Sequence, residues 1–287
     1  MAPLARRAHM VLLPYQHPFA WQPLLAFLAA RAIPGVECVT GDAYRRTIDI
    51  DGQCGQIEVR HEGRRNAVVL GARLPDARAL PQVIDRVRRV FDLDADPQVI
   101  AEHLGADRVL APRVRRLPGL RVPGAWDPFE LGIRAILGQQ VTVKGASTLA
   151  GRVVSLCGRA MSPADASLTH VFPRPADLAA ADLSTLGVPT RRRATLHALS
   201  RAVADDALSF TRSDLDETLG ALPGVGDWTV QYVLMRACGD PDAFPASDLW
   251  LRRAAGASSA SALLMRAESW RPWRAYAAMY LWQGGEP

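Results

Sequence analysis

The chain has 287 residues, a formal net charge of +5 and 49% hydrophobic side chains. These values exclude a wholly disordered chain, and the length allows one large domain or two ordinary ones with a core that needs no disulfide or metal. The small basic excess fits a nucleic-acid partner without requiring one. Because no uncharged stretch of about 18 residues is present, the sequence predicts a soluble cytoplasmic protein without a membrane segment.

The first hundred or so residues predict a small α+β domain. Apolar residues at helical spacing indicate a helix over about 20–33. Three alternating segments follow at 47–51, 56–60 and 67–70, with glycine close after each, and they predict an antiparallel sheet with one buried face. A second amphipathic helix is expected over 80–91.

The rest of the chain predicts helices, since no convincing alternating strand follows residue 75. Pro and Gly cluster over 112–128, which indicates a linker leading into a second domain. Short helices joined by tight turns favour an orthogonal bundle over a long coiled coil. These helices are expected at 129–138, 142–157, 176–186, 190–206, 213–221, 226–238, 247–255 and 267–282. The predicted fold class is α+β, with an N-terminal domain over 1–111 and a mostly helical domain over 112–287.

The cysteines and acidic residues form no recognisable metal site. The four cysteines are Cys38, Cys54, Cys157 and Cys238. Their spacing is too wide for a zinc knuckle or a closely grouped iron–sulfur ligand set, which favours free thiols. Asp92, Asp94 and Asp96 mimic the start of a calcium loop, but Pro97 and His103 stand where that loop needs Gly and Glu. We therefore expect no metal site built from side chains and no cofactor.

Residues 222–229, Leu-Pro-Gly-Val-Gly-Asp-Trp-Thr, form a tight turn between two apolar helical stripes. Gly224 and Gly226 allow positive φ angles and a close approach of the backbone to a ligand. The helix that begins at the turn presents unpaired N–H groups and its positive dipole end. The turn is therefore either a site for one phosphate or an ordinary helical hairpin capped by glycine.

Asp248 stands at the start of the helix expected over 247–255, after a loop that contains Pro245. One interpretation is a helix N-cap, in which Ser247 or Asp248 holds the first-turn amides. The other is a carboxylate placed in a cleft beside the hairpin.

The hairpin, the gap of about twenty residues and Asp248 resemble the helix-hairpin-helix superfamily of DNA glycosylases. Within it the chain is most similar to the AlkA type, DNA-3-methyladenine glycosylase II. Residues 27–32, 129–139 and 270–282 also resemble segments of that type, so the similarity extends from about Trp21 over nearly the whole chain. The resemblance implies an N-terminal α/β domain with an antiparallel sheet, followed by a helical region around a cleft.

The resemblance assigns roles to individual residues. Asp248 corresponds to the catalytic aspartate, which stabilises the sugar cation and can activate water. The residues implied to line the base pocket are Trp228, Tyr232, Trp282 and Phe27. The residues implied to contact DNA are Gly224, Val225, Gly226, Thr229, Gln139, Gln140 and Lys144. Family members can also hold a monovalent cation on the carbonyls of the hairpin. Gln139 and Gln140 fall where the family inserts a side chain into the DNA; that side chain is usually apolar in this type.

The lysine content separates two mechanisms. Related lyases attack the sugar with a lysine amine near the hairpin, but Trp228 occupies that place here and Lys144 is the only lysine. Lys144 is expected to contact a phosphate, which leaves the N-terminal amine as a remote lyase candidate. The sequence therefore predicts a monofunctional enzyme of base excision repair that hydrolyses alkylated purines such as 3-methyladenine and 7-methylguanine from duplex DNA.

Two other functions stay open: a glycosylase for oxidised or deaminated bases, and a DNA-binding module without catalysis. Asp248 and the aromatic residues argue against the second, because binding alone needs none of them. We expect a monomer associated with the nucleoid. Trp270 and Trp273 are expected in the core, and the arginine run 191–193 on the surface.

Overall fold

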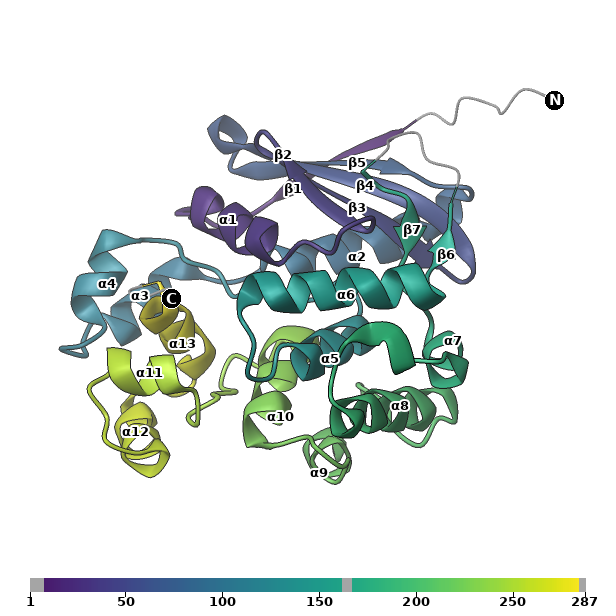
Figure 1. The fold of residues 1–287 in the computed structure, drawn as a ribbon. Coiled ribbons are helices and arrows are strands. Elements are labelled where there is room, and N and C mark those ends of the chain that lie inside the picture. Colours follow the sequence, from purple (N-terminus) through teal and green to yellow (C-terminus); the bar gives the residue numbers. More distant parts are fainter. Residues whose placement is uncertain (1–7, 162–166, 284–287) are drawn as a thin grey trace.

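A computed structural model describes residues 8–161 and 167–283, and it consists of one antiparallel sheet and a larger helical part (Figure 1). The sheet has five strands in the order β1-β5-β4-β3-β2, all antiparallel. The strands are β1 (His9–Pro14), β2 (Glu37–Thr40), β3 (Ala43–Ile50), β4 (Gln53–Glu62) and β5 (Ala67–Arg73). The three predicted strands are confirmed as β3, β4 and β5, while β1 and β2 were not predicted.

The buried face of the sheet follows from the alternation of side chains along each strand. Val59 of β4 pairs with Tyr44 of β3 and with Leu70 of β5, and all three are at most 1% exposed. Residues two apart share a face, so Arg46 of β3 also points into the core, between Tyr44 and Ile48. A guanidinium at such a position needs buried partners.

The helical part contains most of the predicted helices. The helices are α1 (Trp21–Arg31), α2 (Leu80–Val90), α3 (Pro97–Leu104), α4 (Ala111–Arg116), α5 (Pro128–Leu137), α6 (Val143–Cys157), α7 (Pro175–Ala180), α8 (Thr190–Ala204), α9 (Leu215–Gly220), α10 (Asp227–Val233), α11 (Leu249–Ala254), α12 (Ala260–Ala267) and α13 (Arg274–Trp282). Two short strands, β6 (Arg159–Ala160) and β7 (His170–Val171), pair beside α6. The fold class is confirmed. The interpretation of 112–128 as linker missed α4, and the helix predicted over 267–282 is shorter and preceded by α12.

Two hydrophobic cores hold the molecule together. The first packs the sheet, α1 and α2 against α13 and the helices around it, and it includes Trp270, which is 0% exposed as predicted. The second packs α5 to α10 and takes in Ile33 and Val36 from the segment after α1. The domain boundary between residues 111 and 112 stays a prediction. No helix in the described ranges has both the length and the apolar character needed to cross a membrane.

A ring of four charges, three of them buried and Arg134 partly exposed, joins the sheet to α5. Arg46 contacts Glu130 at 2.7 Å and Glu37 at 3.4 Å. Arg134, one turn after Glu130, contacts Glu37 at 2.9 Å and Glu130 at 3.2 Å. Burial alone would raise the pKa of Glu37, but the guanidinium groups of Arg134 and Arg46 outweigh it and hold the pKa below its usual range. Each carboxylate thus faces two guanidinium groups, and the ring fixes α5 relative to the sheet.

A second polar junction ties α13 to the loop after α2. Asp92 has φ of 50°, and its Oδ2 accepts hydrogen bonds from the Tyr276 hydroxyl at 2.8 Å and the Val122 N–H at 3.1 Å. Burial raises the pKa of Asp92 to about 6, against 3.8 for the ordinary carboxyl group. This junction matters for the site because α13 ends at Trp282.

The raised pKa of Asp92 predicts a pH dependence of stability. Between about pH 4 and 6 the folded state binds the Asp92 proton more tightly than the unfolded state, so this contribution to the unfolding free energy is present at low pH and lost as pH rises through 6. Asp92→Asn removes the titration, and asparagine tolerates positive φ. In urea unfolding, we expect the variant to gain about 2 kcal/mol relative to the unaltered protein between pH 4.5 and 7.5. Equal differences at both pH values would contradict this assignment.

Candidate active site

The Asp248 carboxylate is held from two directions. Its Oδ1 accepts hydrogen bonds from the backbone N–H groups of Trp250 at 2.9 Å and Leu251 at 3.0 Å, which caps α11. Its Oδ2 accepts one from the indole N–H of Trp228 at 2.9 Å, and the indole N–H of Trp282 lies 3.4 Å from Oδ1. Asp248 is therefore a helix cap and also a half-buried charge fixed beside two indole rings. Oδ2, with one N–H partner, can still accept from a water molecule.

Three aromatic side chains gather beside this carboxylate. Trp228 and Tyr232 lie four residues apart on α10 and stack with ring centroids 4.9 Å apart and planes inclined by 10°. Trp282 of α13 meets Tyr232 edge to face at 6.4 Å. The structure thus brings these three residues and Asp248 together from α10, α11 and α13. Aromatic faces beside a carboxylate suit a flat, positively charged ring.

Phe27 of α1 joins this group through an arginine that sequence reasoning missed. The guanidinium carbon of Arg236 lies 4.8 Å from the ring centroid of Phe27 and 5.4 Å from that of Tyr232. Arg236 belongs to the π-helical turn Leu234–Cys238 that continues α10, and it is 5% exposed. The available signal was an arginine inside an otherwise apolar helical stripe.

The turn between α9 and α10 is shaped by contacts with α8. Gly224 has φ of 84°, and a Cβ at this position would lie 2.3 Å from the Thr195 hydroxyl oxygen. That hydroxyl donates a hydrogen bond to the Pro223 carbonyl at 2.7 Å. At Gly226, by contrast, a Cβ would meet no heavy atom within 4 Å. Gly224 is therefore required by packing inside the protein, whereas Gly226 leaves an open surface at the start of α10.

The two glutamines after α5 have different surroundings. The Gln139 amide donates hydrogen bonds to the Gly224 carbonyl at 3.1 Å and the Thr229 hydroxyl at 3.2 Å. Arg192 donates to the Gln139 carbonyl at 2.6 Å, so this member of the arginine run is not merely a surface charge. Gln140 is exposed and has φ of 57°. Gln139 thus ties the loop to the hairpin, and Gln140 forms its exposed tip.

Two predicted DNA contacts differ in accessibility. Thr229 is 2% exposed and its hydroxyl accepts from Gln139, so its side chain supports the loop and cannot face a phosphate directly. Lys144 is exposed in the first turn of α6, on a different element from Asp248. Lys144 thus follows the Gln140 loop closely in the chain and is accessible to solvent.

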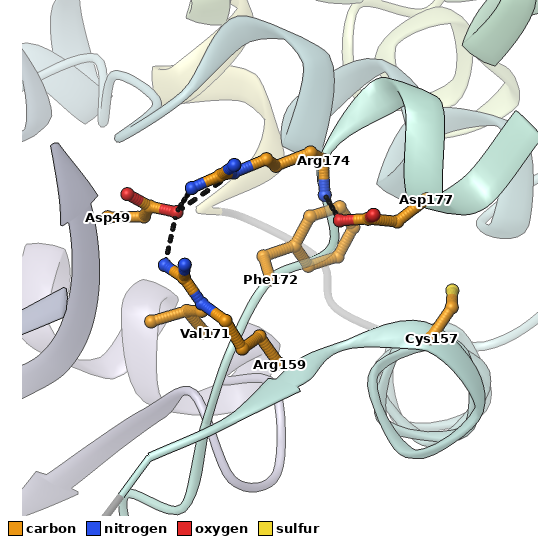
Figure 2. A pocket seen from close by; sticks show the side chains of 7 residues that line it. All are labelled: Asp49, Cys157, Arg159, Val171, Phe172, Arg174 and Asp177. Atoms are coloured by element: carbon orange, nitrogen blue, oxygen red, sulfur yellow. Dashed lines mark hydrogen bonds and ion pairs between the residues drawn. The ribbon is translucent and has the colours of Figure 1, made fainter. Parts of the chain in front are cut away.

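A cavity of about 230 Å³ lies at the opposite end of α6 from Lys144 (Figure 2). In it, Arg159 and Arg174 both contact Oδ2 of Asp49, at 2.6 Å and 2.9 Å. Cys157 also lines it; burial raises the pKa of this thiol to about 11, so the thiol stays protonated at neutral pH. None of the predicted site residues lines this cavity, so its polar contacts serve the junction between β3 and the β6–β7 pair.

All four cysteines have free thiols. Within residues 8–161 and 167–283, no three His, Cys, Asp or Glu side chains converge in a way that could hold a metal ion.

Comparisons with known proteins agree with this architecture. Residues 10–127 match the family model of the AlkA N-terminal domain, and residues 133–273 match that of the HhH-GPD superfamily base excision DNA repair protein. The fold is similar to that of a 3-methyladenine DNA-glycosylase from Archaeoglobus fulgidus, with a TM-score of 0.80 and 22% sequence identity over 95% of this chain and 96% of that one.

Two relatives are similar in sequence over nearly the whole chain. One, from Mycobacterium tuberculosis, is named a probable bifunctional transcriptional activator/DNA repair enzyme AlkA; it is 43% identical over 94% of this chain, which spans 56% of that relative's length. The other is DNA-3-methyladenine glycosylase 2 of Escherichia coli, 34% identical over 97% of this chain and 99% of its own. With the sheet, the hairpin and the setting of Asp248, these matches show that the chain belongs to the AlkA family of helix-hairpin-helix DNA glycosylases.

Proposed function

We propose that the protein is a monofunctional DNA glycosylase that hydrolyses alkylated purines from duplex DNA and leaves an abasic site. The observation that carries this proposal is the Asp248 carboxylate, fixed by the indole N–H of Trp228 beside the Trp228–Tyr232 stack. A module that only binds DNA has no need for a half-buried carboxylate among aromatic rings. The proposal includes a monomeric protein that acts on DNA in the cytoplasm.

The aromatic group selects the base and Asp248 assists bond breaking. A glycosylase extrudes the nucleotide from the stack, at a cost of a few kcal/mol that is smallest for damaged bases. Trp228, Tyr232, Trp282 and Phe27 then surround the base, and a positively charged alkylated purine gains roughly 0.5–2 kcal/mol from each good cation–π contact. As the bond from C1′ to the base nitrogen breaks, its electron pair leaves with the base. The Asp248 carboxylate stabilises the positive charge left on the sugar and orients the water that attacks C1′.

The hairpin and the Gln140 loop hold the DNA during this step. The open surface at Gly226 lets a phosphate approach the first amides of α10. In this proposal Gln140 enters the gap left by the base and Lys144 contacts a nearby phosphate; the exposure of both side chains supports these roles. A monovalent cation on the hairpin carbonyls stays part of the proposal; the Gly224 carbonyl, which accepts from Gln139, keeps a second lone pair.

The proposed catalytic role predicts that Asp248→Asn loses base release and keeps DNA binding. Asparagine can still cap α11, but it removes the negative charge, so we expect a rate loss of roughly 10²–10³-fold. Base release is measured as free 3-methyladenine and 7-methylguanine from methylated duplex DNA. DNA binding is measured with abasic-site DNA. Asp96→Asn is the matched control, because Asp96 caps α3 through the N–H groups of Gln98 and Val99. Full activity in Asp248→Asn would refute the assignment.

The absence of a lysine beside Asp248 predicts that no covalent intermediate forms. A lyase would form a Schiff base between an amine and the sugar, which borohydride reduces to a stable complex. We expect base release without a trapped complex, and strand breaks only after alkaline treatment of the product DNA. A trapped complex containing Lys144 or the N-terminus would show that the protein is a lyase.

An added methyl group should affect mainly DNA binding at Gly226 and mainly stability at Gly224. Gly226→Ala should fold with a stability loss within about 1 kcal/mol but bind DNA roughly tenfold more weakly, because the methyl group stands between a phosphate and the amides. Gly224→Ala should be destabilised by roughly 1–3 kcal/mol, because of its positive φ and the contact with Thr195. Urea unfolding and fluorescence anisotropy with a labelled duplex measure both. Unchanged DNA affinity in Gly226→Ala would argue against phosphate binding at this turn.

A further inference from the structure

Arg236 is a buried cation that lies against two of the rings in the proposed base pocket. Its Nη1 donates a hydrogen bond to the Tyr232 hydroxyl at 2.6 Å. Its Nε and Nη2 donate to the carbonyls of Pro123 at 2.6 Å and Gly124 at 3.2 Å. In the described part of the chain, no carboxylate lies within ion-pairing distance of Arg236. All three direct hydrogen-bond partners of its guanidinium are thus neutral groups.

Other charged groups lie around Arg236. A cavity of about 20 Å³ behind Phe27, large enough for about one water molecule, is bordered by Arg236, Arg31 and the ring of Arg46, Arg134, Glu37 and Glu130. Burial alone would raise the pKa of the Tyr232 hydroxyl, but the charges of Arg236, Arg31 and Arg134 outweigh it and hold the pKa below its ordinary value. At the Tyr232 hydroxyl, positive charges therefore outweigh negative ones.

Arg236 and Asp248 lie at opposite ends of one row of contacts. The Asp248 carboxylate accepts from the Trp228 indole at 2.9 Å, the Trp228 ring stacks on Tyr232 at 4.9 Å, and the Tyr232 hydroxyl accepts from Arg236 at 2.6 Å. The aromatic stack thus has a negative group at one end and a positive group at the other.

This polarity matches the movement of charge when a glycosidic bond breaks. The electron pair of the bond passes to the base, so the base becomes one unit more negative while the sugar becomes positive. A cationic base leaves as a neutral molecule, whereas an uncharged base leaves as an anion or takes up a proton. A positive charge at the base end favours this change in both cases, but in the bound state before cleavage it repels only the cationic base.

We infer that Arg236 is a specificity-determining residue, whose charge at the base end of the pocket promotes release of uncharged bases relative to positively charged ones. This inference rests on the proposed function. For an uncharged base, Arg236 raises the maximal rate without changing the half-saturating protein concentration. For a cationic base, Arg236 raises the half-saturating protein concentration and the maximal rate in similar proportion. The ratio of maximal rate to half-saturating concentration therefore changes little. Unit charges about 10 Å apart at an effective dielectric constant near 20 give an effect on the order of tenfold.

The test compares Arg236→Met with the unaltered protein in single-turnover assays on two duplexes that differ only at the target base. One carries 7-methylguanine, which is positively charged, and the other carries hypoxanthine, which is not. We expect the ratio of maximal rate to half-saturating concentration to fall about tenfold for hypoxanthine and to stay nearly constant for 7-methylguanine. For 7-methylguanine, the maximal rate and the half-saturating protein concentration should each decrease in Arg236→Met.

Arg121→Met is the matched control. Arg121 is 1% exposed and also donates to backbone carbonyls, those of Gln16, Pro18, Asp92 and Ala95, but it has no contact with the pocket rings. This variant should lose stability and keep the preference between the two bases. Arg236→Gln removes the charge and keeps hydrogen-bond donors, so it replaces Arg236→Met if that variant does not fold. Arg236→Lys retains the charge and should retain the preference.

The outcomes separate this inference from the proposed function. A tenfold change of preference in the neutral variants, absent in Arg236→Lys and Arg121→Met, supports it. Equal losses on both duplexes would show a purely structural Arg236 and overturn it, as would release of 7-methylguanine but no detectable hypoxanthine by the unaltered protein. If the unaltered protein releases neither base, the proposed function itself fails.

Discussion

The geometry of the site depends on the buried ring of Arg46, Glu37, Arg134 and Glu130. Removing one partner of such a buried pair typically costs about 3–5 kcal/mol, because the other charge is left without compensation. The ring therefore allows one placement of α5 against the sheet. Since α5 leads directly into the loop of Gln139 and Gln140, these four side chains fix that loop relative to the sheet.

Polar contacts and the backbone of α5 and α10 together connect that ring to Asp248. Gln139, two residues beyond the end of α5, binds the hairpin at Gly224 and Thr229, and the hairpin starts α10. The first turn of α10 carries Trp228, which binds Asp248. The loop expected to enter DNA and the carboxylate expected to assist cleavage are thus parts of one connected support, so they keep a defined distance from each other in the free protein.

Much of this arrangement was accessible from the sequence, and the rest was not for identifiable reasons. The alternation of polar and apolar residues revealed β3 to β5. β1 was missed because its apolar run 10–13 does not alternate and because its pairing partner, β5, lies far along the chain. The hairpin and Asp248 have local signatures. Gln139 and Gln140 are identical in type, so only their contacts distinguish the supporting residue from the exposed one. Arg46 and Arg236 carried a usable signal, because each stands at an inward position within an apolar pattern.

The buried arginines give this molecule interior positive charges that a change of pH does not remove. Of the 34 basic side chains only Lys144 is a lysine, and the buried basic residues at 46, 121 and 236 are all arginines. A guanidinium remains ionised under any condition in which the protein is folded. The positive charge beside Phe27 and Tyr232 is therefore a permanent property of the fold.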